Sequence, residues 1–139
     1  MSRSFAAPLD AVDQVEPSAD GITATKRIVA TDPYLEGHYP GFPIYPGVFT
    51  LETVHQAARR AVEASRGPDV RVELAAVRSV RFRAPLLPGD VLTASCQLRV
   101  DPDDPRRVRV VADCRRGDGV ASAKVTLELR VLAGGSADA

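Results

Sequence analysis

"GHYPGFPIYPGVFTLETVHQAARRAVEA", residues 37–64, joins a loop rich in proline and glycine to a long segment that contains neither. In that segment, Val48–Ala64, apolar residues recur at spacings of three and four, the period of an amphipathic helix. At 1.5 Å per residue, the segment predicts a helix about 26 Å long. "SRGPD" at 65–69 should end it, because Gly67 suits a left-handed cap and Pro68 cannot continue a helix.

The sequence on both sides of this helix predicts β-strands. Before the loop, residues 22–30 are rich in β-branched residues and read as a strand, and a short strand is expected near residues 11–15. After the helix, apolar and polar residues alternate, which is the period of half-buried strands. The residues predicted to face inward are Val70, Val72, Leu74, Val80, Phe82, Leu92, Ala94, Cys96, Leu98, Val100, Val108, Val110, Ala112, Cys114, Val125, Leu127, Leu129 and Val131. The predicted hairpin turns are "PGD" at 88–90, "DPDDP" at 101–105 and "RGDG" at 116–119.

These elements predict an α+β protein, in which one long helix covers the apolar face of an antiparallel sheet. A chain of 139 residues suits a single domain, which we place at residues 1–139 with an ordered core of about 8–132. The C-terminal segment "AGGSADA" is small and polar, and we expect it to be flexible.

Composition argues against several classes of function. Lys and Arg number 18, and Asp and Glu also number 18, so no overall charge attracts the chain to nucleic acid or to an anionic membrane. No apolar run approaches the roughly 20 residues of a membrane span, and the first residues do not resemble a signal peptide. Cys96 and Cys114 have no metal-ligand spacing. We expect both to be buried, reduced thiols in a cytoplasmic protein.

Two motifs carry a resemblance to a known family. "HYPGFPIYPGVFTLE", residues 38–52, resembles the His-aromatic-Pro-Gly-x-Pro-x-x-Pro-Gly-Val-x-x-x-Glu signature of bacterial 3-hydroxyacyl-[acyl-carrier-protein] dehydratases. "FRAPLLPGD", residues 82–90, is similar to the Phe-x-x-Pro-x-x-Pro-Gly-Asp turn of the same family. The similarity runs from about residue 22 to residue 131. It implies the hotdog fold, an antiparallel sheet wrapped around one long central helix, usually in a dimer.

The resemblance also implies a site and a reaction. His38 corresponds to the family's catalytic histidine and Glu52 to its catalytic acid, and in the family the two residues of one site come from different protomers. Gly47 corresponds to the residue whose amide holds the substrate carbonyl. The implied enzyme is a lyase that converts a 3-hydroxyacyl thioester, borne on the phosphopantetheine arm of an acyl carrier protein, into the trans-2-enoyl thioester. Fatty-acid and polyketide-type synthesis both use this step.

The residue types suit that chemistry. A neutral imidazole is a suitable base for the C2 proton at neutral pH, and a carboxyl group in an apolar pocket can stay protonated to assist loss of hydroxide. Pro40, Pro43 and Pro46 restrict the backbone near His38, which a softer loop would not hold in place. No Ser, Thr, Asp or Asn caps the start of the helix, so its free N–H groups are available to an enolate oxygen. No metal or organic cofactor is expected, because the sequence contains no motif for binding a metal and none for binding an organic cofactor.

The remaining candidates each have a plainer reading as well. Gln56 either hydrogen-bonds Glu52 or is a structural amide. The aromatic residues either line a substrate tunnel or pack the loop. The substrate-binding candidates are Gly47, Val48, Tyr39, Phe42, Tyr45 and Gln56.

His55 marks a departure from the family, which usually has a small or apolar residue three positions after the acid. It lies on the same helix face as Glu52, and either packs there with a hydrogen bond or tunes the acid. Arg78, Arg81 and Arg83 flank the second motif, and they either form a solvated strand face or dock an acidic carrier protein.

Two other functions compete with the dehydratase. The chain can be a largely structural subunit in a heterodimer of hotdog proteins, although such a subunit would need neither His38 nor Glu52. It can also be a hotdog thioesterase or a hydratase of CoA thioesters. Thioesterases of this fold commonly lack the His-Pro-Gly loop, so the first motif disfavours them.

Overall fold

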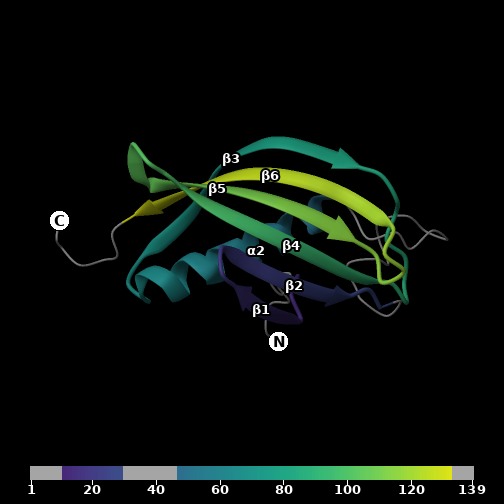
Figure 1. The fold of residues 1–139 in the computed structure, drawn as a ribbon. Coiled ribbons are helices and arrows are strands. Elements are labelled where there is room, and N and C mark those ends of the chain that lie inside the picture. Colours follow the sequence, from purple (N-terminus) through teal and green to yellow (C-terminus); the bar gives the residue numbers. More distant parts are fainter. Residues whose placement is uncertain (1–10, 30–46, 133–139) are drawn as a thin grey trace, which may run out of the picture.

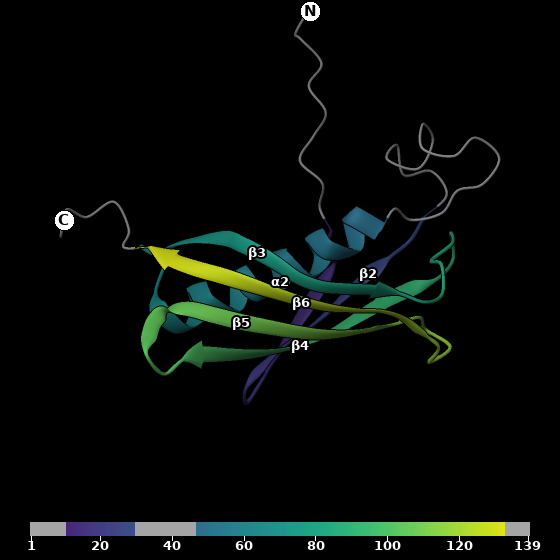
Figure 2. The ribbon, with the colours of Figure 1, turned by 90° about the horizontal axis from the view of Figure 1, so that it is seen from above.

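The computed structural model describes residues 11–29 and 47–132. Its elements are β1 (Gln14–Ser18), β2 (Gly21–Arg27), α2 (Gly47–Arg66), β3 (Arg71–Phe82), β4 (Val91–Asp101), β5 (Asp104–Arg115) and β6 (Ala121–Leu132). The strands form one antiparallel sheet in the order β1-β2-β4-β5-β6-β3. The sheet curves around α2, which lies behind it in Figure 1 and runs along its inner side in Figure 2. The predicted α+β fold is confirmed.

The helix begins one residue before the predicted start and ends two residues after the predicted end. Gly67 has a φ of 102°, and its N–H donates to the Glu63 carbonyl at 2.8 Å, so the predicted left-handed cap is confirmed. One face of α2 is buried against the sheet and carries Thr50, Thr53, Val54, Ala57, Ala58 and Val62. Within the described ranges, no helix is long and apolar enough to span a membrane.

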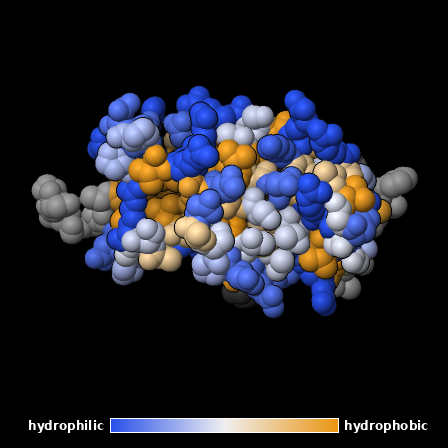
Figure 3. Space-filling view, viewed as in Figure 1, coloured by the Kyte–Doolittle hydropathy of each residue, from blue (hydrophilic) through white to orange (hydrophobic). Residues whose placement is uncertain are grey.

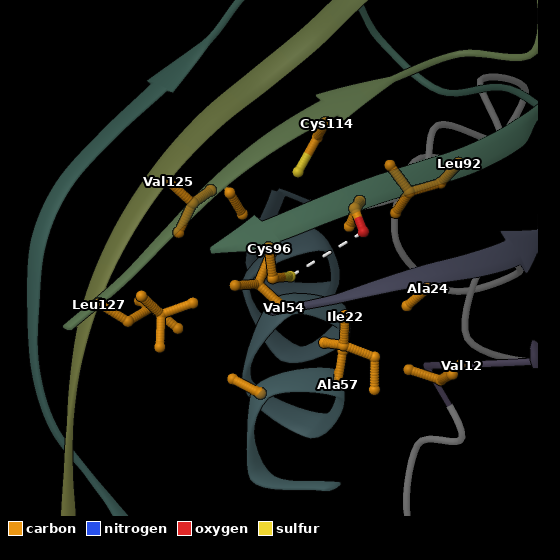
Figure 4. Close-up of a cluster of buried hydrophobic side chains, with 14 of the residues drawn as sticks. Val12, Ile22, Ala24, Val54, Ala57, Leu92, Cys96, Cys114, Val125 and Leu127 are labelled. Atoms are coloured by element: carbon orange, nitrogen blue, oxygen red, sulfur yellow. Dashed lines mark hydrogen bonds between the residues drawn. The ribbon is translucent and has the colours of Figure 1, made fainter. Parts of the chain in front are cut away.

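The core lies between this helix face and the inner face of the sheet. Figure 4 shows Val54 and Ala57 of α2 opposite Cys96, Val125 and Leu127 of the central strands. The alternation predicted for β4, β5 and β6 is confirmed over most of their length, since the inward positions are buried. Figure 3 shows the outer face of the sheet, where hydrophilic side chains cover much of the surface between apolar ones.

The expected alternation holds in β3 for Val72 and Val80, which pack against the core, but is wrong for Leu74 and Phe82. This strand is an edge strand that pairs only with β6, and its register with β6 shifts between Leu74 and Ala76 and again between Val77 and Ser79. Leu74 and Phe82 lie opposite the buried residues Leu129 and Ala123 of β6, yet they are 40% and 55% exposed, because an edge strand has no further strand beside it to cover its side chains. Val100, also predicted to face inward, is 52% exposed beside a register shift at the end of β4.

The first two strands also differ from the predicted bounds. The short strand expected near residues 11–15 is β1 at Gln14–Ser18, because it pairs with β2 across the turn at 19–20. The strand expected at 22–30 is β2 at Gly21–Arg27, which ends where it stops pairing with β4.

The turns after the helix are of two kinds. "DPDDP" and "RGDG" form the predicted hairpins between β4 and β5 and between β5 and β6. "PGD" at 88–90 is a turn but not a hairpin, because β3 and β4 are not neighbours in the sheet. The segment 83–90 instead connects the β3 edge to β4 past the ends of two intervening strands.

Candidate active site

The start of α2 meets the second sequence motif. A Cβ atom on Gly47 would lie 2.6 Å from Cζ of Phe82, so only glycine allows this close contact. The two residues come from motifs that are separated by most of α2 and most of β3. The first N–H groups of any helix lack partners within it, and no acidic residue occupies the first turn of α2. This helix end therefore presents the positive end of its dipole.

A hollow of about 370 Å³ lies at this contact. Most of its lining is apolar, and its polar side chains are Thr50 and Ser122, both buried, and the exposed Arg83. The lining residues are Gly47, Thr50, Phe82, Arg83, Ala84, Pro85, Leu86 and Ser122. The arrangement suits a ligand that is largely apolar and bears a few oxygen atoms.

The turn of the second motif is fastened on two sides. The Asp90 carboxylate accepts a hydrogen bond from the Leu87 N–H at 2.7 Å. The Gly89 N–H donates to the Ile28 carbonyl at 2.8 Å, and the Ile28 N–H donates to the Asp90 carbonyl at 3.0 Å. The turn thus anchors the chain shortly before the segment that contains His38.

Glu52 lies on a different side of the helix from this hollow. Five residues separate it from Gly47, which corresponds to about 140° around the helix axis. Its side chain is 37% exposed, and its Oε1 lies 2.9 Å from Nδ1 of His55. The prediction that Glu52 and His55 share a helix face is confirmed. His55 Nε2 is buried and has no hydrogen-bond partner among the described residues.

Gln56 is used structurally. Its Oε1 accepts a hydrogen bond from the Ala11 N–H at 3.1 Å, while the Thr53 hydroxyl donates to the Ala11 carbonyl at 2.8 Å. Together they hold the chain before β1 against the helix. This supports the reading of Gln56 as a structural amide, and its role in substrate binding stays a prediction. Val48 is well exposed at the helix start, and its role also stays a prediction.

The other residues of the first motif, His38, Tyr39, Phe42 and Tyr45, lie outside the described residues. Their roles stay predictions.

The three candidate docking arginines differ in their surroundings. Arg78 pairs with Glu128 at 3.1 Å. Arg81 is exposed opposite Lys124 in the sheet, and Arg83 is exposed at the hollow. Only Arg81 and Arg83 therefore lie at the end of β3 that reaches the start of α2.

The cysteines are neither paired nor arranged as ligands. Both are free and buried, and burial raises the pKa of each thiol to about 12. They are therefore protonated near neutral pH, as expected for small core residues. Within the described residues, no group of three or more His, Cys, Asp or Glu side chains is placed to hold a metal ion.

Ser122 is a site candidate that sequence reasoning missed. The alternation of β6 puts it in phase with outward-facing Lys124, yet it is buried. Only the pairing of β6 with β5 reveals the reason, so no local sequence signal could have found it.

This chain resembles known proteins both in sequence and in structure. A family model described as ApeI-like, the ApeI dehydratase, matches residues 14–124. The 3-hydroxyacyl-[acyl-carrier-protein] dehydratase FabZ of Polynucleobacter necessarius is 33% identical over 88% of this chain and 81% of that protein. FabZ of Symbiobacterium thermophilum is 40% identical over 81% of this chain and 70% of that protein. FabZ of Nitratidesulfovibrio vulgaris is 38% identical, and there the match spans 66% of this chain and 62% of that protein.

Solved structures share the fold. The dehydratase heterocomplex ApeI:P from Xenorhabdus doucetiae matches with a TM-score of 0.60 and 19% identity, over 84% of this chain and 94% of that chain. The thioesterase HI1161 from Haemophilus influenzae matches with a TM-score of 0.70 and 15% identity, over 92% and 81%. At such identities the likeness concerns the fold alone, which dehydratases and thioesterases share.

Proposed function

Because this chain belongs to the 3-hydroxyacyl-[acyl-carrier-protein] dehydratases of the hotdog fold, we propose that His38 and Glu52 carry out its dehydration reaction. The substrate is a 3-hydroxyacyl thioester on an acyl carrier protein, and the product is the trans-2-enoyl thioester. The observation that carries the proposal is the contact of Gly47 with Phe82, because it joins the two motifs of the family at the start of α2.

The reaction divides among three groups. Neutral His38 removes the C2 proton, and the electrons of the C–H bond move toward the thioester carbonyl. N–H groups at the start of α2, including that of Gly47, stabilise the developing enolate oxygen. The C3–O bond then breaks as Glu52 gives its proton to the departing hydroxyl, which leaves as water. His38 ends protonated and Glu52 ionised, so one proton must return before the next cycle.

The site is shared between two protomers in this proposal. Glu52 lies on a different side of α2 from the hollow beside Gly47, which supports a role for it in the site of a partner. The edge strand β3, with exposed Leu74 and Val77, supports an interface that covers this edge. The partner is a second copy or a related hotdog subunit, as in the ApeI:P heterocomplex.

The proposal extends to the whole chain. The described residues form one sheet and one core, which supports a single domain at 1–139 with a core of about 8–132. The two free, buried cysteines are compatible with a cytoplasmic location. Fatty-acid and polyketide-type synthesis are both suitable settings, because both make 3-hydroxyacyl chains on carrier proteins.

The test is loss of turnover without loss of fold. A positioned acid or base typically contributes about 10²–10⁴ in rate, so His38→Ala and Glu52→Gln should each reduce turnover at least about a hundredfold. The melting temperature and the dimer should stay near those of the wild type. Folded variants that keep wild-type dehydration rates would exclude these roles and favour the structural subunit.

Mixing the two inactive variants tests the shared site. A mixed dimer has one site with both residues intact, so about half of the wild-type activity per mixed dimer should return. No recovery after confirmed subunit exchange would mean that each site takes both groups from one chain.

We propose that the carrier protein docks at Arg81 and Arg83, with Arg78 at the margin because Glu128 already pairs with it. Changing both Arg81 and Arg83 to glutamate should raise KM for carrier-bound substrate and leave KM for a short thioester mimic unchanged. Arg99 and Arg109 face each other across β4 and β5 and provide a control pair with the same charge change. Equal losses on both substrates, or equal effects of both pairs, would contradict docking at Arg81 and Arg83.

A further inference from the structure

A β-bulge controls the direction of one serine. Cys114 of β5 pairs with Ala123 of β6, but the next β5 residue, Arg115, pairs with Ala121. Ser122 is therefore the extra residue of the bulge and has no partner across the ladder. An extra residue of this kind interrupts the alternation of the strand and can redirect a side chain. In keeping with this, Ser122 is only 2% exposed, whereas Lys124, two residues later, is exposed.

The redirected hydroxyl group has no hydrogen-bond partner in the part of the chain that the structure describes. The Ser122 carbonyl accepts a hydrogen bond from the Arg83 N–H at 2.8 Å, so the backbone on this side is paired. The hydroxyl oxygen is buried and has no hydrogen-bond partner among the described residues. A buried polar group without a partner reduces stability, and alanine would fill the same space without that cost. A role in core packing therefore does not explain the serine.

The position of Ser122 in the structure supplies a reason for having a serine there. It lines the hollow of about 370 Å³ that also contains Gly47 at the start of α2 and Phe82 of the second motif. An oxygen-bearing ligand in this hollow would give the hydroxyl its missing partner. We propose that Ser122 is a substrate-binding residue whose hydroxyl hydrogen-bonds the C3 oxygen of the 3-hydroxyacyl chain. This inference rests on the proposed function.

The chemistry of the two ends of the substrate selects the C3 oxygen. The thioester carbonyl is only an acceptor and suits the N–H groups at the start of α2. The C3 hydroxyl both donates and accepts, as does a serine hydroxyl, so the two can pair in either direction. A hydrogen bond there holds the leaving oxygen in place for the acid.

Binding of an unreactive ligand pair tests the contact. A 2,2-difluoro-3-hydroxyacyl pantetheine thioester has no C2 proton to lose, and the 2,2-difluoroacyl thioester of equal length lacks only the C3 hydroxyl. Ser122→Ala should weaken binding of the hydroxylated ligand about tenfold and leave binding of the other unchanged. Ser122→Thr, which keeps a hydroxyl, should retain the preference for the hydroxylated ligand. Ser95→Ala, at an exposed position of β4, is the control and should change neither affinity.

Thermal unfolding without ligand provides the second readout. Ser122→Ala removes a buried hydroxyl without a partner, so its melting temperature should rise above that of the wild type. A fall would indicate a structural role and overturn the proposal. Equal weakening of both ligands would place the hydroxyl at the carbonyl instead, and unchanged affinities would exclude it from the site; either result overturns the C3 assignment.

The proposed catalytic roles and the proposed role of Ser122 can be refuted independently of each other. The affinities do not depend on which residues act as acid and base, because neither ligand can react. Wild-type turnover by Glu52→Gln and His38→Ala would refute the catalytic roles while leaving the binding result to decide the role of Ser122.

Discussion

The helix α2 begins at one glycine and is followed by another, and the two are required for different reasons. Gly67 has a φ of 102°, and a Cβ atom there would meet nothing within 4 Å. Its backbone conformation requires glycine. Gly47 has no positive φ, but a Cβ atom there would lie 2.6 Å from the Phe82 ring. At this position it is the close contact with the Phe82 ring that favours glycine.

The two ends of α2 therefore differ in role. The contacts at Gly67 concern the stability of the helix, whereas those at Gly47 concern the proposed site. At its C-terminal end, Gly67 completes a local cap by bonding Glu63, four residues away. The hollow beside that end, about 610 Å³, has no buried unpaired hydroxyl among its described lining residues. At the N-terminal end, Phe82 and Ser122 from distant strands line a hollow together with Gly47 of the helix start. The first end closes the helix with a local cap, and the second is where we propose that the substrate binds.

The largest effect on activity is expected from a substitution at Gly47. Gly47→Ala forces the Phe82 ring away from the helix start, and a displacement of about 1 Å at a reacting site can cost about a hundredfold in rate. We expect a loss of that order in kcat/KM. Because the Phe82 ring is 55% exposed and can turn outward, the melting temperature should change little. A fully active Gly47→Ala enzyme would show that this contact does not shape the site.

A smaller effect on activity is expected at His55, whose Nδ1 lies 2.9 Å from Oε1 of Glu52 on the same face of the helix. His55→Leu removes the hydrogen bond and leaves the carboxyl group free to change rotamer, so kcat should fall about tenfold with KM nearly unchanged. His55→Asn can present an amide near the place of Nδ1 and should recover part of the loss. If both variants lose only melting temperature, and kcat and its pH profile stay the same, His55 is a packing residue.

The smallest effect is expected at Gly67. Gly67→Ala places a side chain in the left-handed region, which costs about 1 kcal/mol in the free energy of unfolding. Denaturant unfolding should show this loss, while kcat and KM stay at wild-type values. A fall in activity without a fall in stability would reverse the assignment of the two helix ends.

The sequence predicted the local elements well because their signals are periodic. The helix was placed within two residues at either end, and the inward positions of β5 and β6 were identified, because each depends on spacing within one segment. The cap at Gly67 was also predicted correctly, because its signal lies within the few residues at the end of the helix. The hotdog fold came from the resemblance of two motifs, since one helix and a curved sheet do not by themselves specify it.

Tertiary structure decided what depends on pairing between distant strands. The exposure of Leu74 and Phe82 follows from the edge position of β3, which no repeat within the strand reveals. The turn at "PGD" was expected to join neighbouring strands, but β6 and β5 lie between β3 and β4.

The candidate site likewise contains residues that the sequence predicted and one that only the tertiary structure revealed. The resemblance of the two motifs to the family predicted site roles for Gly47 and Glu52, and those roles stay predictions. Ser122 was invisible, because its inward direction depends on a one-residue mismatch between β5 and β6. A strand's own alternation determines which side a residue should face, whereas a bulge is set by the partner strand, so only the assembled sheet could turn this hydroxyl toward the start of α2.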